Sequence, residues 1–170
     1  QTAPSILEIE GTRFIVAGNS TDTLYIINSD GSLNNFIPTG GNIQTSPIFL
    51  DVNGTAYILF ASKDNHLYAV DLNGGSLLGW PIEVDRDVQG SLAVADLNGN
   101  GFPEIIAGTE LGELLVFRLD GTPYRHFPLT LNLPFSGSPS IVDIDNDGDL
   151  EILGGTGGSL VIIDVKEEGF

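Results

Sequence analysis

The chain has 170 residues with a formal net charge of -17, 41% hydrophobic residues and no cysteine. That hydrophobic content excludes a disordered acidic tail, and the acidic surface disfavours nucleic acid and anionic lipid as partners. Disulfides and thiolate metal sites are excluded, and no apolar run approaches the roughly 18 residues that insertion into a membrane requires.

A strand-rich unit recurs four times along the chain, starting at Pro4, Pro47, Ser91 and Pro139. An acidic residue closes the first strand of each copy, at intervals of 43, 45 and 47 residues. These four acids are Glu8, Asp51, Asp96 and Asp143. A repeat of this length has room for one small four-stranded sheet.

The remainder of each repeat predicts further strands joined by Gly- and Asn-containing turns. Third strands are expected at 23–28, 66–71, 113–118 and 159–164. A short fourth strand is expected to end in an aromatic residue beside proline, because proline suits an edge strand. These endings are Phe36-Ile37-Pro38, Trp80-Pro81 and Phe127-Pro128. The strands are nearly continuous apolar runs, which indicates sheets covered on both faces.

The sequence therefore predicts an all-β fold, a single β-propeller domain of four-stranded antiparallel blades. The expected blades span about residues 1–45, 46–89, 90–136 and 137–170, and the last lacks its outer strand. Three arrangements fit: a four-bladed ring, part of a larger propeller, or a half closed by a second copy. The sequence begins with Gln1 and has no methionine, which favours a mature or excised fragment.

Two of the turns between first and second strands carry oxygen ligands at alternating places. Each then has glycine at the sixth place and glutamate at the ninth. Such side chains converge on one point, and calcium takes about six to eight oxygens, including a backbone carbonyl from the seventh place. The candidate ligands of the earlier turn are Asp96, Asn98, Asn100, Phe102 and Glu104. Those of the later turn are Asp143, Asp145, Asp147, Asp149 (through its carbonyl) and Glu151. Two calcium ions are therefore predicted.

Three alternatives compete with these calcium sites. Magnesium prefers few protein ligands and retained waters, and an EF-hand needs glutamate at the twelfth place, where Gly154 stands. A turn rich in Asp, Asn and Gly also forms without any metal. That last interpretation suits the shorter turns at Glu8–Gly11 and Asp51–Gly54, whereas the crowded carboxylates after Asp143 would repel one another without a cation.

The segments SLAVADLNGNGFPEIIAGT and SPSIVDIDNDGDLEILGGTGGSLVIID are similar to the FG-GAP/VCBS repeats of integrin-α-like propellers and of many secreted bacterial proteins. The resemblance covers about residues 4–164. It implies calcium loops in the third and fourth repeats only, and a secreted or cell-surface location.

Catalytic patterns are weak. Of the two histidines, His66 is expected to open a third strand and His126 to belong to an edge strand, and neither is expected to act as a catalytic base. The GGTGG segment at 154–158 lacks the lysine and helix of a phosphate-binding loop. The expected function is a non-enzymatic, calcium-binding module for adhesion, ligand binding or assembly, with a protein or glycan ligand of unknown identity. The alternatives are part of a calcium-dependent, lyase-like polysaccharide enzyme, or a self-assembling filament repeat. A homo-oligomer, or blades of a parent chain, would complete the propeller.

Overall fold

The computed structural model describes residues 2–166, which form fifteen β-strands in four antiparallel sheets. Sheet 1 contains β1 (Ser5–Ile9), β2 (Thr12–Gly18), β3 (Thr23–Asn28) and β4 (Leu33–Pro38). Sheet 2 contains β5 (Ile48–Val52), β6 (Thr55–Ser62), β7 (His66–Val70) and β8 (Ile82–Glu83). Sheet 3 contains β9 (Val88–Ala95), β10 (Glu104–Thr109), β11 (Glu113–Phe117) and β12 (Leu129–Thr130). Sheet 4 contains β13 (Ser140–Val142), β14 (Leu150–Gly155) and β15 (Leu160–Val165).

The strands follow one another within each sheet, as expected for propeller blades. Sheet 4 has three strands in the described residues, and the prediction that its outer strand is missing concerns residues after Lys166, outside the described part of the chain. The all-β propeller architecture predicted from the repeats is therefore confirmed.

The prediction for the fourth strands is correct only in sheet 1, where β4 contains Phe36 and Pro38. In sheets 2 and 3 the aromatic–proline pair precedes the strand instead of ending it, and both X–Pro bonds are cis. The fourth strands β8 and β12 have two residues each, and pairing with the third strand determines their position. Leu67 lies opposite Ile82, and Leu114 lies opposite Leu129. A segment that short has no periodicity from which to predict it.

Neighbouring sheets pack face to face, and a separate buried cluster fills each of the three spaces between them. Ile26 and Phe60 belong to the cluster between sheets 1 and 2, and Leu59 and Ile105 to the one between sheets 2 and 3. The cluster between sheets 3 and 4 includes Ile152. At about 25 cal/mol per Å² of apolar surface, burial of these large aliphatic side chains is the main stabilising contribution.

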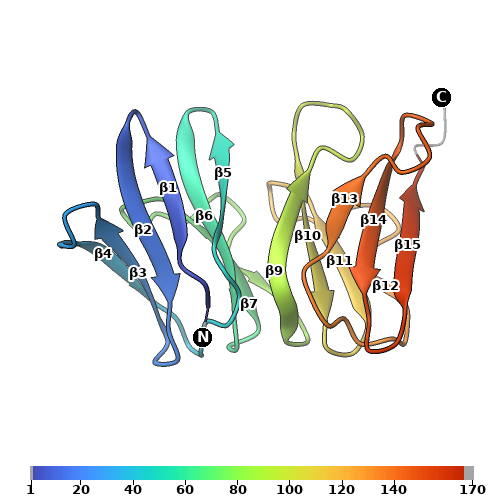
Figure 1. The fold of residues 1–170 in the computed structure, drawn as a ribbon, viewed down its shortest axis with the longest axis horizontal. Helices are drawn as coiled ribbons and strands as arrows, with labels where there is room; N and C mark the ends of the chain where they lie inside the picture. Colours follow the sequence, from blue (N-terminus) through green and yellow to red (C-terminus); the bar gives the residue numbers. More distant parts are fainter. Residues whose placement is uncertain (1, 167–170) are drawn as a thin grey trace.

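The four sheets form an open stack, with sheets 1 and 4 at opposite ends (Figure 1). In the described residues no buried cluster joins these two end sheets. The predicted burial of both faces is correct for sheet 3, where every residue of β10 is buried. It is wrong for the end sheets, whose strands alternate between buried and exposed positions, as β15 does. The described residues are therefore not arranged as a closed four-bladed ring.

Candidate metal site

The turn between β13 and β14 brings together acids that are far apart along an extended chain. Asp143 directly follows β13, and Glu151 lies in β14 opposite Val142. Two residues with positive φ allow the tight turn between them, Asn146 at 62° and Gly148 at 98°. At 98° a side chain would be strained, so the glycine predicted at the sixth place is a conformational requirement.

Three of the predicted ligands converge: Asp143, Asp145 and Glu151 each place a carboxylate oxygen within 4.8 Å of the others. Calcium–oxygen distances of about 2.3–2.6 Å allow two ligand oxygens to lie up to about 5 Å apart across the ion. The spacing of these three oxygens therefore fits a calcium ion between them.

Backbone groups hold two of these carboxylates by one oxygen each. Glu151 Oε2 accepts a hydrogen bond of 2.7 Å from the N–H of Ile144, and Asp143 Oδ2 accepts one of 3.2 Å from Gly148. The other oxygens, Asp143 Oδ1 and Glu151 Oε1, are buried and have no hydrogen-bond partner. A buried carboxylate oxygen without a partner costs free energy, so this pair of oxygens is suited to a cation.

Asp147, the predicted third ligand, is oriented differently. Its Oδ1 accepts a hydrogen bond of 3.0 Å from the N–H of Asp149, and its Oδ2 lies 3.3 Å from Lys166 Nζ. These interactions lower the pKa of Asp147 below its ordinary value, with the hydrogen bond from Asp149 as the largest cause. The structure therefore does not bring Asp147 into the cluster of three acids. The proposed carbonyl ligand of Asp149 stays a prediction.

Lys166 is a residue that the sequence did not point to. Its Nζ lies 3.1 Å from Asp164 as well as close to Asp147. The register of the hairpin, in which Glu151 pairs with Asp164, places the residues after β15 beside the acidic turn. Knowledge of the β14–β15 register would therefore have placed Lys166 beside the acidic turn.

The turn between β9 and β10 has the same backbone arrangement. Glu104 is 2% exposed, and its Oε2 accepts a hydrogen bond of 2.9 Å from the N–H of Leu97. Asp96 Oδ2 accepts one of 2.7 Å from Gly101, just as Asp143 does from Gly148. The two turns are thus built alike, as their equal spacing predicts.

Their side chains differ at the third place of the turn. Asn98 Nδ2 lies 3.5 Å from Glu104 Oε1 and 3.3 Å from the hydroxyl of Tyr124. Within residues 2–166, the acids of this turn form no cluster comparable with that of Asp143. Burial raises the pKa of Glu104 above its ordinary value. An amide donor thus faces the glutamate where the later turn has an acid.

Two further predicted ligands of the earlier turn interact with each other. The N–H of Phe102 donates a hydrogen bond of 2.7 Å to Asn100 Oδ1, and the Phe102 side chain is 62% exposed. These contacts stabilise the turn. A role of the Phe102 carbonyl or of Asn100 as a metal ligand stays a prediction.

The two short turns have other interactions for their acids. Glu8 forms an ion pair of 2.8 Å with Arg13, and Asp51 Oδ1 accepts a hydrogen bond of 2.9 Å from the N–H of Gly54. The interpretation of these turns as ordinary hairpin turns agrees with both contacts.

The two histidines differ in how they match expectation. His66 opens the third strand of its sheet, β7, as predicted, and its Nδ1 lies 2.8 Å from the carbonyl oxygen of Asp64. The prediction that His126 belongs to an edge strand is wrong: it lies in a turn before the cis Phe127-Pro128 bond, with a backbone φ of 65°, and β12 begins only at Leu129.

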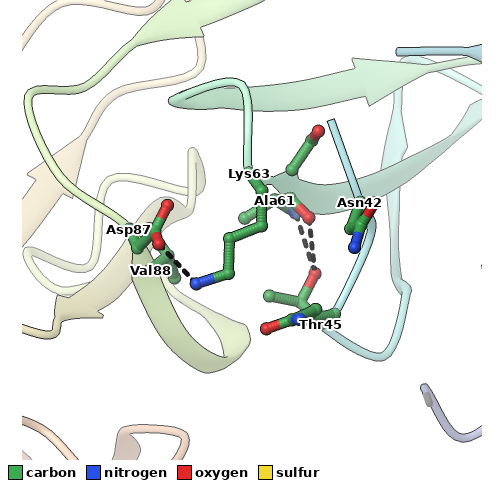
Figure 2. A pocket seen from close by; sticks show the side chains of 8 residues that line it. Asn42, Thr45, Ala61, Lys63, Asp87 and Val88 are labelled. Atoms are coloured by element: carbon green, nitrogen blue, oxygen red, sulfur yellow. Dashed lines mark hydrogen bonds and ion pairs between the residues drawn. The ribbon is translucent and has the colours of Figure 1, made fainter. Parts of the chain in front are cut away.

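A small pocket lies between sheets 2 and 3 and the segment that links sheet 1 to sheet 2 (Figure 2). Lys63 Nζ forms an ion pair with Asp87, and Thr45 exchanges hydrogen bonds with the backbone N–H and carbonyl of Ala61 over 2.8 and 3.2 Å. The remaining volume of about 10 Å³ holds at most one water molecule. This pocket joins adjacent sheets and has no room for an organic ligand.

Comparison with known proteins supports the architecture. An FG-GAP-like repeat model matches residues 96–154, which include both long acidic turns. No curated protein sequence has significant similarity to the chain. Residues 2–166 contain no helix that is long and apolar enough to cross a membrane.

Three solved propeller structures resemble the chain. The biofilm matrix protein Bap1 of Vibrio cholerae has a TM-score of 0.72 and 18% identity, over 96% of this chain and 26% of Bap1. The C-terminal domain of PilY1 from Pseudomonas aeruginosa has a TM-score of 0.68 and 18% identity, over 91% of this chain and 44% of that one. BamB from Moraxella catarrhalis has a TM-score of 0.66 and 14% identity, over 96% of this chain and 46% of BamB.

The chain thus spans less than half the length of these three proteins, and the likeness concerns the fold. The repeat match and the four sheets agree on one assignment. This chain is a propeller-type array of sheets, and its residues 96–154 match an FG-GAP-like repeat.

Proposed function

We propose that the chain is a non-enzymatic, extracellular propeller module that calcium stabilises and that presents a surface for adhesion, ligand binding or assembly. The observation that carries the calcium assignment is the buried pair of carboxylate oxygens, Asp143 Oδ1 and Glu151 Oε1, without hydrogen-bond partners. Asp145 supplies the third oxygen of the group.

Calcium would have a structural role at this turn. Asp143 follows one strand of a hairpin and Glu151 lies in the other, so an ion bound to both ties the two strands together. The ion also offsets the repulsion among three carboxylates whose oxygens lie within 4.8 Å. Occupancy would therefore stabilise sheet 4, which, like sheet 1, packs on one neighbouring sheet instead of two.

The extracellular assignment rests on the repeat type and on the surface charge. FG-GAP-like repeats match residues 96–154, and one structural relative, Bap1, is a biofilm matrix protein. A net charge of -17 suits partners that are cationic or neutral, such as glycans. Binding to a panel of glycans and matrix proteins tests this part, and loss of any such binding in EDTA would link it to calcium.

Thermal unfolding with and without calcium tests the metal site. Calcium at one hundred times its dissociation constant stabilises the native state by about 2.7 kcal/mol, which raises the Tm of a chain of this size by roughly 5–10 °C. Glu151→Gln should abolish that increase. Glu110→Gln, which removes one charge from an exposed turn, is the matched control and should keep it. Equal Tm values for the unsubstituted protein in calcium and in EDTA would exclude the site.

A further inference from the structure

The outer face of sheet 1 is exposed and apolar. Ile15 pairs with Ile6 on one side and Ile27 on the other, and Tyr25 pairs with Phe36, so their side chains share this face. Ile6 is 67% exposed and Phe36 53%. We call Ile6, Ile15, Tyr25, Ile27 and Phe36 the leading face.

The same position in the later repeats packs against the preceding sheet. Ile15 lies in the second strand of its sheet and pairs with one residue of the first strand and one of the third. The residues in the same place of the later sheets are Ile58, Ile105 and Ile152. These three isoleucines are 0%, 0% and 1% exposed, whereas Ile15 is 38% exposed. The leading face therefore has the residues of a sheet-to-sheet interface, but no sheet formed by residues 2–166 covers it.

The outer face of sheet 4 is the counterpart. Leu160 lies opposite Gly155, near the end of the second strand of its sheet. The leucines in the same place of the earlier sheets are Leu24, Leu67 and Leu114. Those three leucines pack toward the following sheet and are 0% exposed, but Leu160 is 62% exposed.

Further apolar residues extend this surface. Ile162 is 49% exposed and Val142 42%, although Ile162 corresponds to Val116, which is 1% exposed. We call Val142, Leu153, Leu160 and Ile162 the trailing face. It has the residues that would pack against a following sheet.

We propose that these two faces bind each other between two copies of the chain, so that a pair of stacks closes into one ring. Each leading face would pack on the partner's trailing face in the way that sheet 3 packs on sheet 2. A two-fold pair contains two contacts between a leading face and a trailing face. Together these contacts bury both faces of both copies. Monomeric proteins rarely leave two such apolar faces in water.

The size of related propellers matches a pair of these stacks. The stack superposes on BamB and on the PilY1 domain over nearly all of its own length but only 46% and 44% of theirs. A ring of that size therefore needs about as many further sheets as the chain itself provides.

Charged residues lie at the acidic-turn end of both faces. Arg13 lies opposite Glu8 on the side of the leading face, and Asp164 lies opposite Glu151 on the side of the trailing face. Arg13 already forms an ion pair with Glu8, and Asp164 with Lys166, so the apolar residues and not these charges carry the pairing. The remaining net charge of each copy opposes association, so salt should strengthen the pair.

Mass measurements in solution test the proposal, in the presence of calcium and again in EDTA. The expected species is a dimer, twice the 18.0 kDa of one chain. Ile15→Asp and Leu160→Asp should each raise the dimer dissociation constant at least tenfold, because each places a charge in an apolar contact. Leu78→Asp, at a position 86% exposed between β7 and β8, is the control and should leave the dimer intact. Circular dichroism checks that each variant is folded.

Mixing the two variants distinguishes this pairing from any other. Ile15→Asp keeps a normal trailing face and Leu160→Asp a normal leading face, so the mixture should form a heterodimer through one unaltered interface. A monomer at high concentration, masses that grow without limit, or absence of the heterodimer would each overturn the proposal. A dimer in EDTA would support the pairing whether or not the calcium assignment holds, because neither Ile15 nor Leu160 belongs to the candidate metal site.

Discussion

Asn98 and Asp145 occupy the same place in consecutive acidic turns and face their glutamates with opposite polarity. Asn98 Nδ2 lies 3.5 Å from Glu104 Oε1, whereas Asp145 places a carboxylate oxygen within 4.8 Å of one from Glu151. In the earlier turn an amide hydrogen takes the position that a cation would take in the later one. The later turn is therefore expected to bind calcium more tightly.

Asn98→Asp should raise the calcium affinity of the earlier turn by at least tenfold, about 1.4 kcal/mol, because an acid replaces the amide donor. Calorimetric titration and native mass spectrometry would report the change in affinity and the number of ions. Asn132→Asp, on a loop of the same sheet, adds the same charge away from the turn and should change neither. Unaltered affinity in Asn98→Asp would contradict the role assigned to the amide.

Asp64 should stabilise the protein in a pH-dependent way. Although burial favours its neutral form, hydrogen bonds from the Tyr68 hydroxyl and the Gly40 N–H, each 2.7 Å, hold the pKa of Asp64 below its ordinary value of 3.8. Because the pKa is lower in the folded state, the ionised group stabilises the fold above pH 3.8. That contribution is lost as the pH falls through the folded-state pKa.

Asp64→Asn should cost about 1–2 kcal/mol of unfolding free energy at neutral pH, since charge-assisted hydrogen bonds are lost. Urea unfolding of both proteins across acidic pH is the measurement, and their difference should shrink below pH 3.8. Asp85→Asn controls for removal of one exposed negative charge. A difference that stays constant down to the acid transition would refute this origin.

Trp80 should be an energetic link between sheets 2 and 3. Its side chain is 7% exposed, and Nε1 donates a hydrogen bond of 2.9 Å to the carbonyl oxygen of Leu119. Trp80→Phe removes this donor and part of the buried ring, so it should destabilise the fold by about 1–3 kcal/mol. Denaturant unfolding followed by circular dichroism measures the loss. Leu78→Ala, at an exposed position two residues away, should stay within about 0.5 kcal/mol of the parent.

The ion pair of Lys63 and Asp87 should contribute modestly to the contact between sheets 2 and 3. Their side chains are 32% and 23% exposed, so solvent screens the pair in part. A double-mutant cycle with Lys63→Gln and Asp87→Asn should give a coupling of about 0.5–1 kcal/mol that decreases in high salt. A coupling near zero at low salt would show that the pair adds no stability.

Much of the fold follows from the repeat. The acids at Glu8, Asp51, Asp96 and Asp143 each lie at or next to the end of a first strand, and the third strands agree with prediction to within a residue or two. Long apolar strands repeated at nearly equal intervals leave few alternatives. The fourth strands of sheets 2 and 3 were misplaced because pairing with the third strand, not local pattern, determines a two-residue strand.

The candidate site was predictable in composition but not in every contact. Spacing alone brought out Asp143, Asp145 and Glu151, which the structure groups together. It also selected Asp147, whose carboxylate instead meets Lys166. That contact depends on the register of β15 against β14, which brings a residue nineteen places later beside the turn.

The sequence by itself determined the repeating sheet, the number of repeats and the chemistry of the two long turns, because strand pattern and turn composition are local properties. Only the tertiary structure decided which residues are covered. Ile15 and Ile58 have the same side chain and the same place in their repeats, yet one is 38% exposed and the other is fully buried. The difference arises because sheet 2 has a sheet on each side and sheet 1 has one neighbour, a property of the stack and not of either residue.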